Sequence, residues 1–198
     1  LKRKFLEYEL THRRIADVGD ADILPTNVED TFANITNMTR RILERGAMPV
    51  VLGGDHAITF PVVRAYDQPL HVVHFDAHID YAPFLHGYEY TNVHAFRHIY
   101  HMEHVKSLTQ VGIRSLRNTQ SWVEDSIQDG NRVITADEFR DLGPSGIVAP
   151  LSRDAKCYVS IDIDVLDLPL VPGCVSAEPN GLTYAELRDT LSALAEHT

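Results

Sequence analysis

Apolar residues recur along the chain with two different periods, and the two periods alternate. Between residues 28 and 42 apolar side chains return every three or four positions, which predicts an amphipathic helix. Asn27 is the expected N-cap of this helix, and Gly46 marks its end. Short, continuous apolar runs lie between the helical stretches and are typical of strands buried on both faces. This alternation predicts an α/β fold with a mainly parallel sheet.

The apolar runs predict five strands, which we expect at 49–52, 71–75, 108–113, 132–135 and 157–163. Further helices are expected at 121–129 and after Thr183, which forms a capping box with Glu186. The chain opens on Leu1 and ends directly after this last helix, where a doubly wound sheet often adds another strand. We therefore expect a single domain over residues 1–198 that lacks parts at both ends.

Composition narrows the classes of partner. The 198 residues include 18 Lys and Arg against 28 Asp and Glu, a net charge of −10. This balance argues against nucleic acid, which requires clustered basic residues, and suits steering of a cationic substrate. No apolar run approaches the ~20 residues of a membrane helix, and no signal-peptide pattern is present. We therefore expect a cytoplasmic protein with no membrane partner, and the two cysteines exclude a disulfide scaffold.

Three clusters of acidic and histidine residues lie at the carboxyl ends of three of the predicted strands. They are Gly-Gly-Asp-His at 53–56, Asp-Ala-His-Ile-Asp at 76–80 and Asp-Ile-Asp at 162–164. The carboxyl ends of parallel strands meet at one edge of the sheet, where open α/β sheets bind their ligands. Side chains two positions apart on an extended chain point to the same side. The convergent groups are therefore expected to be His56, Asp76, His78, Asp80, Asp162 and Asp164.

Four carboxylates in one buried group repel each other strongly unless cations neutralise them. Two divalent ions would do so, and a mixed oxygen and nitrogen donor set suits Mn²⁺ better than a thiolate-rich zinc site. Each cluster taken alone has an ordinary structural explanation, such as a strand end, a turn or a helix cap. Their occurrence in series, each just past an apolar strand, favours a binuclear metal site.

The same three motifs resemble the signatures of the ureohydrolase family, which includes arginases, agmatinases, guanidinobutyrases and formiminoglutamases. In full they are Gly-Gly-Asp-His at 53–56, Phe-Asp-Ala-His-Ile-Asp at 75–80 and Ser-Ile-Asp-Ile-Asp-Val-Leu-Asp at 160–167. The resemblance runs from about Ile15 to the end of the chain. It implies a three-layer αβα fold with a mainly parallel, doubly wound sheet, and two Mn²⁺ ions per subunit, with Ni²⁺ or another divalent ion as alternatives.

The resemblance also implies a role for each motif residue. One metal would be held by His56, Asp76, Asp80 and Asp162. The other would be held by Asp76, His78, Asp162 and Asp164, so that Asp76 and Asp162 bridge the pair. Asp80 would in addition orient the attacking hydroxide, and Asp55 would position its neighbour His56.

Two further residues are implied to act on the substrate. His94, in Tyr-Thr-Asn-Val-His, matches the family's catalytic proton shuttle, with His86 and His98 as rivals. Glu178, in Glu-Pro-Asn-Gly-Leu-Thr, matches the carboxylate that pairs with the substrate's guanidinium. The structural alternatives are a helix whose histidines face solvent or a partner, and a loop carboxylate that caps the following helix.

The implied reaction is hydrolysis of a guanidino C–N bond to urea and an amine, and the Glu-Pro-x-Gly form favours an agmatinase-like enzyme of polyamine metabolism. The alternatives are a formiminoglutamase and a guanidino-acid hydrolase, which would need a basic residue such as Arg97 or Arg114 for the substrate's carboxylate. An amide deacetylase is disfavoured because the chain has no His-His pair. A non-catalytic metal-binding subunit is disfavoured because every ligand position is intact. A trimer or hexamer is the expected assembly.

Overall fold

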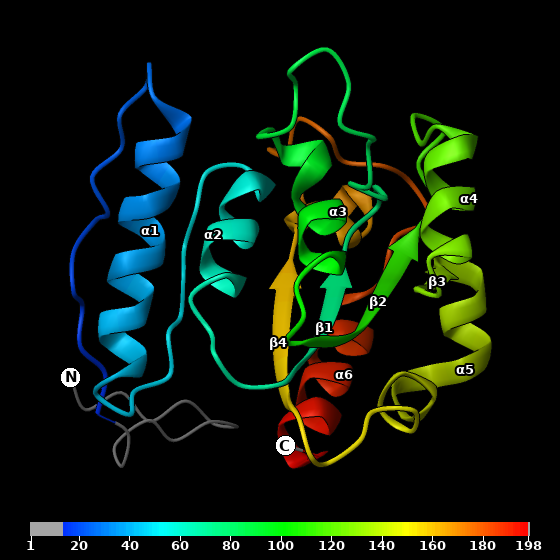
Figure 1. The fold of residues 1–198 in the computed structure, drawn as a ribbon. Coiled ribbons are helices and arrows are strands. Elements are labelled where there is room, and N and C mark those ends of the chain that lie inside the picture. Colours follow the sequence, from blue (N-terminus) through cyan, green and yellow to red (C-terminus); the bar gives the residue numbers. More distant parts are fainter. Residues whose placement is uncertain (1–13, 198) are drawn as a thin grey trace.

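A parallel sheet forms the centre of the computed structural model, which describes residues 14–197 (Figure 1). Its strand order is β3-β2-β1-β4, with β1 at Leu70–Phe75, β2 at Val105–Ile113, β3 at Arg132–Thr135 and β4 at Lys156–Ile161. Every pair of neighbouring strands is parallel. The first three strands are added in one direction, and β4 returns to the free side of β1. The winding therefore reverses between β1 and β4.

Helices cover both faces of the sheet (Figure 1). They are α1 (Val28–Leu43), α2 (Thr59–Val63), α3 (Ala95–Tyr100), α4 (Gln120–Gln128), α5 (Ala136–Val148) and α6 (Tyr184–His197). Leu70 and Val72 of β1 pack in a core with α1, α2 and α3, whereas Val73 and Phe75 pack in a second core with α5 and α6. This division confirms the expected three-layer α/β fold. Within residues 14–197 no helix has both the length and the apolar character that crossing a bilayer requires.

The sequence pattern located most elements to within a few residues. The Asn27 side chain accepts a hydrogen bond from the Asp30 N–H at 3.0 Å and so caps α1, as predicted. Thr183 and Glu186 form the predicted reciprocal bonds before α6. The pattern missed α2, α3 and α5. These helices are short or interrupted, and α5 is broken by Gly143, which lies outside the helical region at φ +62°.

The predicted strand at 49–52 is wrong. This segment is not paired with any strand among the described residues, and Val50 and Leu52 are 77% and 93% exposed. An apolar run becomes a strand only where another strand offers its hydrogen-bonding edge. The outer edge of β4 is unpaired within residues 14–197, and the 49–52 segment does not reach it.

Gly112 is the position in β2 that brings this strand against the loop after β1. Its φ is +96°, and a Cβ there would lie 2.7 Å from Val165 Cγ2 and 3.0 Å from the Asp76 carbonyl oxygen. We therefore expect Gly112→Ala to lower the free energy of unfolding by roughly 2–5 kcal/mol, through backbone strain and overpacking together. Urea denaturation measures this change.

Gly130 provides the matched control for this prediction. Its φ is +84°, but nothing lies within 4 Å of the position that a Cβ would take. Gly130→Ala should therefore show only the strain of the backbone, about 1–2 kcal/mol. Equal losses in the two variants would contradict the close approach at Gly112.

Candidate metal centre

Two carboxylates stand at the point where the sheet reverses its winding. Asp76 directly follows β1, and Asp162 directly follows β4. The backbone pairing continues past both strand ends, because the Asp162 N–H donates to the Phe75 carbonyl at 2.8 Å and the Asp76 N–H donates to the Val111 carbonyl at 3.0 Å. Neighbouring strands therefore hold these side chains next to each other, as the sequence pattern predicts.

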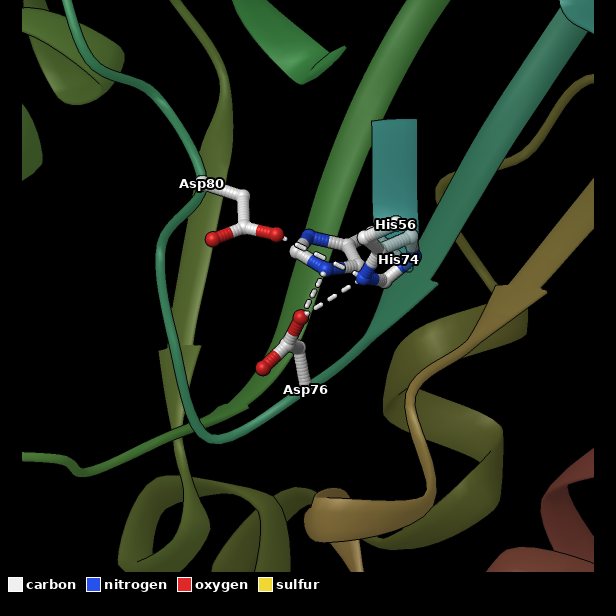
Figure 2. Close-up of side chains that lie close together, drawn as sticks. All are labelled: His56, His74, Asp76 and Asp80. Carbon is white, nitrogen blue, oxygen red and sulfur yellow. Dashed lines mark hydrogen bonds and ion pairs between the residues drawn. The ribbon is translucent and has the colours of Figure 1, made fainter. Parts of the chain in front are cut away.

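Asp76 is the centre of the cluster and is 1% exposed. Its Oδ2 lies 2.9 Å from His56 Nδ1 and 2.9 Å from His74 Nε2, while its Oδ1 lies 3.3 Å from His78 Nδ1. Figure 2 shows the two imidazoles of His56 and His74 meeting beside the Asp76 carboxylate, with Asp80 facing them from the loop after β1. One carboxylate thus touches three imidazoles.

The other predicted ligands surround the same point in two groups. Oδ2 of Asp80 and Oδ2 of Asp162 lie 3.5 and 3.6 Å from His56 Nδ1. Asp164 Oδ2 lies 3.1 Å from His78 Nδ1. The structure therefore brings together every ligand that the motifs predicted. One group gathers at His56 and the other at His78, with Asp76 reaching both.

Backbone conformation and local hydrogen bonds orient the side chains of Asp80 and His56. Asp80 adopts a left-handed backbone conformation with φ +45°, a strained state that non-glycine residues rarely occupy and that clusters at functional sites. His56 begins a short 3₁₀ turn, His56–Ile58, that Asp55 caps by accepting from the Ala57 N–H. Ser160 Oγ lies 2.8 Å from His56 Nε2 and so fixes the ring from the other side. The predicted positioning role of Asp55 stays a prediction, with this cap in its favour.

The cluster carries more negative charge than its surroundings tolerate. Burial and the neighbouring charge of Asp76 raise the pKa of Asp80 well above its usual range. Burial would also raise the pKa of Asp76, but hydrogen bonds with its three imidazole neighbours outweigh burial and hold that pKa well below its usual range. Burial would lower the pKa of His78, yet hydrogen bonds with Asp164 and Asp76 raise it to about 10. These shifts have a common cause, the excess of buried carboxylates, which favours positive charge at the site.

The residues present fit a divalent metal pair. The structure groups His56, His74, Asp76 and Asp80 within reach of one ion, and Asp76, His78 and Asp164 within reach of another. His78 Nε2 is buried without a hydrogen-bond partner, which is uncommon for a polar atom and leaves this nitrogen available to a ligand. Carboxylate oxygens combined with imidazole nitrogens suit Mn²⁺ and related ions.

His74 is the buried residue that the motif analysis did not single out. It is fully buried, and its Nε2–H donates to Asp76 Oδ2 while its Nδ1 accepts from Gln110 Nε2 at 3.2 Å. Its ring stacks on Phe96 with the centroids 3.6 Å apart. Burial lowers its pKa to about 4, so the ring is neutral and acts as a donor to Asp76. The sequence does contain a signal for this residue, because His74 lies two positions before Asp76 and side chains at this spacing on a strand point to the same face.

We expect His74→Phe to weaken Mn²⁺ binding by roughly ten- to a hundredfold, because the Asp76 carboxylate loses the hydrogen bond that orients it. Isothermal titration with Mn²⁺ measures the affinity. His71→Phe is the matched control, since His71 lies in the same strand and is hydrogen-bonded to Ser107 and Ser152 away from the cluster. Similar losses of affinity in both variants would mean that a general loosening of β1 is responsible.

A cleft of about 310 Å³ opens onto the cluster. Its lining includes Asp76, His78, Asp80, Asp162 and Asp164, together with Asn92, Val93, Arg117, Asn118, Trp122, Ile79 and Ser176. Glu178 stands beside it, with Oε1 3.9 Å from His78 Nε2. A hydrogen bond from Ser115 and then the charge of Arg117 lower the pKa of Glu178, so this carboxylate is ionised.

The His94 imidazole does not line this cleft in the described part of the chain, although its neighbours Asn92 and Val93 do. His94 is 5% exposed, and Thr91 Oγ1 lies 2.8 Å from its Nδ1. The rival His98 places its Nε2 against the Glu89 carbonyl oxygen. His94 therefore lies at the edge of the site, and its proton-shuttle role stays a prediction.

The two arginines expected to serve a substrate carboxylate are engaged elsewhere. Arg97 donates to the Tyr81 and Ala82 carbonyls and pairs with Asp125 at 2.6 Å. Arg114 donates to several backbone carbonyls, among them those of Asp164 and Glu178. Both side chains hold loops together and neither lines the cleft. The basic residue that does line it, Arg117, was not singled out by the sequence pattern.

Fold and cluster together define a class: parallel α/β proteins that gather carboxylates and imidazoles where the sheet reverses its winding. The family model described as the Arginase family matches residues 2–198. The chain belongs to the arginase family, which confirms the resemblance drawn from the three motifs.

The chain is similar to members of this family that are named for different substrates. The chain is 34% identical to the guanidinopropionase of Pseudomonas aeruginosa over 91% of its own length and 59% of that protein. It is 32% identical to the agmatinase of Pyrococcus horikoshii over 99% of its length and 68% of that protein. The crystal structure of formimidoylglutamase from Bacillus subtilis superposes with a TM-score of 0.86 at 27% identity, covering 96% of this chain and 63% of that one. The chain thus spans about three fifths to two thirds of these relatives.

Proposed function

We propose that this chain forms the hydrolytic centre of a metal-dependent enzyme that cleaves a guanidino C–N bond and releases urea and an amine. The observation that carries the proposal is the convergence of the motif carboxylates and imidazoles beneath an open cleft, with the ionised Glu178 at its side. Membership of the arginase family supports the same reaction class. The expected resident metal is a pair of Mn²⁺ ions, with Ni²⁺ or another divalent ion as alternatives.

The residues of the cluster would have different roles in holding the metals and orienting the nucleophile. When bound, two divalent ions supply a nucleophile at neutral pH by lowering the pKa of water. His56 and His78 would each serve one ion, while Asp76 and Asp162 would serve both. Asp80, held at its strained turn, would accept a hydrogen bond from the nucleophile and so orient it.

Substrate binding falls to groups beside the metals. Glu178 would hold the substrate's guanidinium through charge-assisted hydrogen bonds, which are about twice as strong as neutral ones. The amine that leaves must take up a proton, and His94 is the predicted donor. Burial lowers the pKa of His94, which favours the neutral ring, so His94 would relay a proton rather than hold one.

Urea release by the full-length, Mn²⁺-loaded protein tests this proposal. We would offer agmatine, arginine, 4-guanidinobutyrate and 3-guanidinopropionate side by side, with Asp162→Asn as the inactive control. Urea from one of them, absent in the control, is the expected result. Two bound ions without urea from any substrate would overturn the guanidine assignment and direct attention to formimino compounds and amides. Sedimentation velocity on the same preparation tests the predicted trimer or hexamer.

A further inference from the structure

One arginine, Arg117, lies in the lining of the acidic cleft. Among the described residues that line it, Arg117 is the only Lys or Arg, and it faces a lining that includes four aspartates. It lies in the loop that follows β2, three residues after Arg114. Its side chain is 59% exposed, so the guanidinium sits toward the mouth of the cleft rather than at the metal cluster.

The contacts of Arg117 differ from those of the arginines that hold the scaffold. Its Nε and Nη2 both lie 3.2 Å from Glu178 Oε1, and Nη2 also donates to the Ser176 carbonyl oxygen at 3.1 Å. Ser115 connects the two partners, since its Oγ accepts from the Arg117 N–H and donates to Glu178 Oε1. The carboxylate proposed to bind a substrate guanidinium therefore already binds a guanidinium of this chain.

We propose that Arg117 binds the carboxylate of the substrate's tail and so selects guanidino acids. This inference rests on the proposed function and names its substrate class. When such a substrate enters, its guanidinium takes the place of Arg117 at Glu178, and its carboxylate pairs with the released Arg117. One internal ion pair is exchanged for two ion pairs with the substrate, and no charge is left without a partner.

The exchange is physically favourable for this particular pair. A half-exposed ion pair is weak because water competes for both partners, so Arg117 leaves Glu178 readily. The planar guanidinium then offers a carboxylate two parallel N–H donors, a geometry that an ammonium group does not match. A dication such as agmatine would instead bring its second positive charge beside Arg117. The cleft thus favours a guanidino acid over agmatine, against the preference that the motif resemblance suggested.

Steady-state kinetics of full-length, Mn²⁺-loaded Arg117→Gln tests the inference with 4-guanidinobutyrate and agmatine. We expect the KM for 4-guanidinobutyrate to rise roughly ten- to a hundredfold, the equivalent of one lost charge-assisted hydrogen-bond pair, with little change in kcat. The KM for agmatine is expected to fall, because a like charge is removed. Arg117→Lys should restore part of the loss. Arg153→Gln, an exposed arginine before β4, is the control for a change in net charge.

Parallel changes for both substrates would overturn the inference, because they would mean that Arg117 only positions Glu178. Calorimetric binding of 4-guanidinobutyrate separates this inference from the proposed function. If the wild-type protein binds this compound without releasing urea, and Arg117→Gln loses the binding, Arg117 keeps its role and the proposed hydrolysis fails. If both proteins bind it equally, the assignment of Arg117 is wrong whatever the outcome for urea.

Discussion

Asp76→Asn is expected to remove metal binding and urea release together. Asp76 touches three imidazoles and reaches both halves of the cluster, so the amide removes a negative charge that both halves share. Loss of the metals withdraws several kcal/mol of transition-state stabilisation, and we expect the rate to fall on the order of a thousandfold or more. Metal analysis by plasma mass spectrometry and a urea assay on the same sample measure the two effects.

The matched control for this change is Asp129→Asn. Asp129 accepts a hydrogen bond from the Tyr81 hydroxyl at 2.7 Å, at the end of α4 and outside the cleft lining. The same loss of one carboxylate charge there should leave the metal content intact. If the Asp76→Asn protein kept two bound ions and released urea at the wild-type rate, Asp76 would not be a shared ligand of the two ions.

Mn²⁺ is expected to raise the melting temperature of the protein by roughly 8–16 °C. The buried carboxylates repel each other, and Asp80 and Asp162 are both held with raised pKa values by burial and by the charge of Asp76. An ion that binds only the folded state stabilises it by about 4 kcal/mol at a thousand times its Kd, and each kcal/mol is worth about 2–4 °C at this size.

Differential scanning calorimetry with added Mn²⁺, and then with EDTA, measures this shift. The Asp76→Asn protein serves as the matched comparison, because its shift should largely vanish. If neither Mn²⁺ nor EDTA changed the melting temperature of the wild-type protein, this result would contradict a metal pair at this site, whatever the enzyme assay shows.

The net charge of the chain and the charge of its cleft lead to different expectations for the substrate. A net charge of −10 suits a cationic substrate, because charge acts on approach over long distances. The proposed role of Arg117 acts only within the cleft, at distances of a few ångströms, where its guanidinium would select the end group of the substrate. Composition averages over the surface and cannot report the position of a single positive charge within an acidic cleft.

Most of the cluster of carboxylates and imidazoles was predictable from the sequence because its predicted members, apart from His56, follow the ends of β1 and β4. A buried strand is a local feature of the apolar pattern, and the alternation of side chains along it is fixed by backbone geometry. Parallel pairing then brings the strand ends to one edge of the sheet. Asp76 and Asp162 thus met as predicted, and Asn27 and Thr183 capped their helices through bonds that span only three residues.

Other features were decided only by the tertiary structure. Residues 49–52 have the composition of a strand but do not pair with any described strand, and most of the segment is exposed. His74 supports Asp76 only because Gln110 of the neighbouring strand donates to its other ring nitrogen. Arg117 faces the cleft only because the loop after β2 meets the loop that carries Glu178, 61 residues further along the chain. Local patterns fix what each segment prefers, whereas contacts between distant segments depend on how all of them pack together.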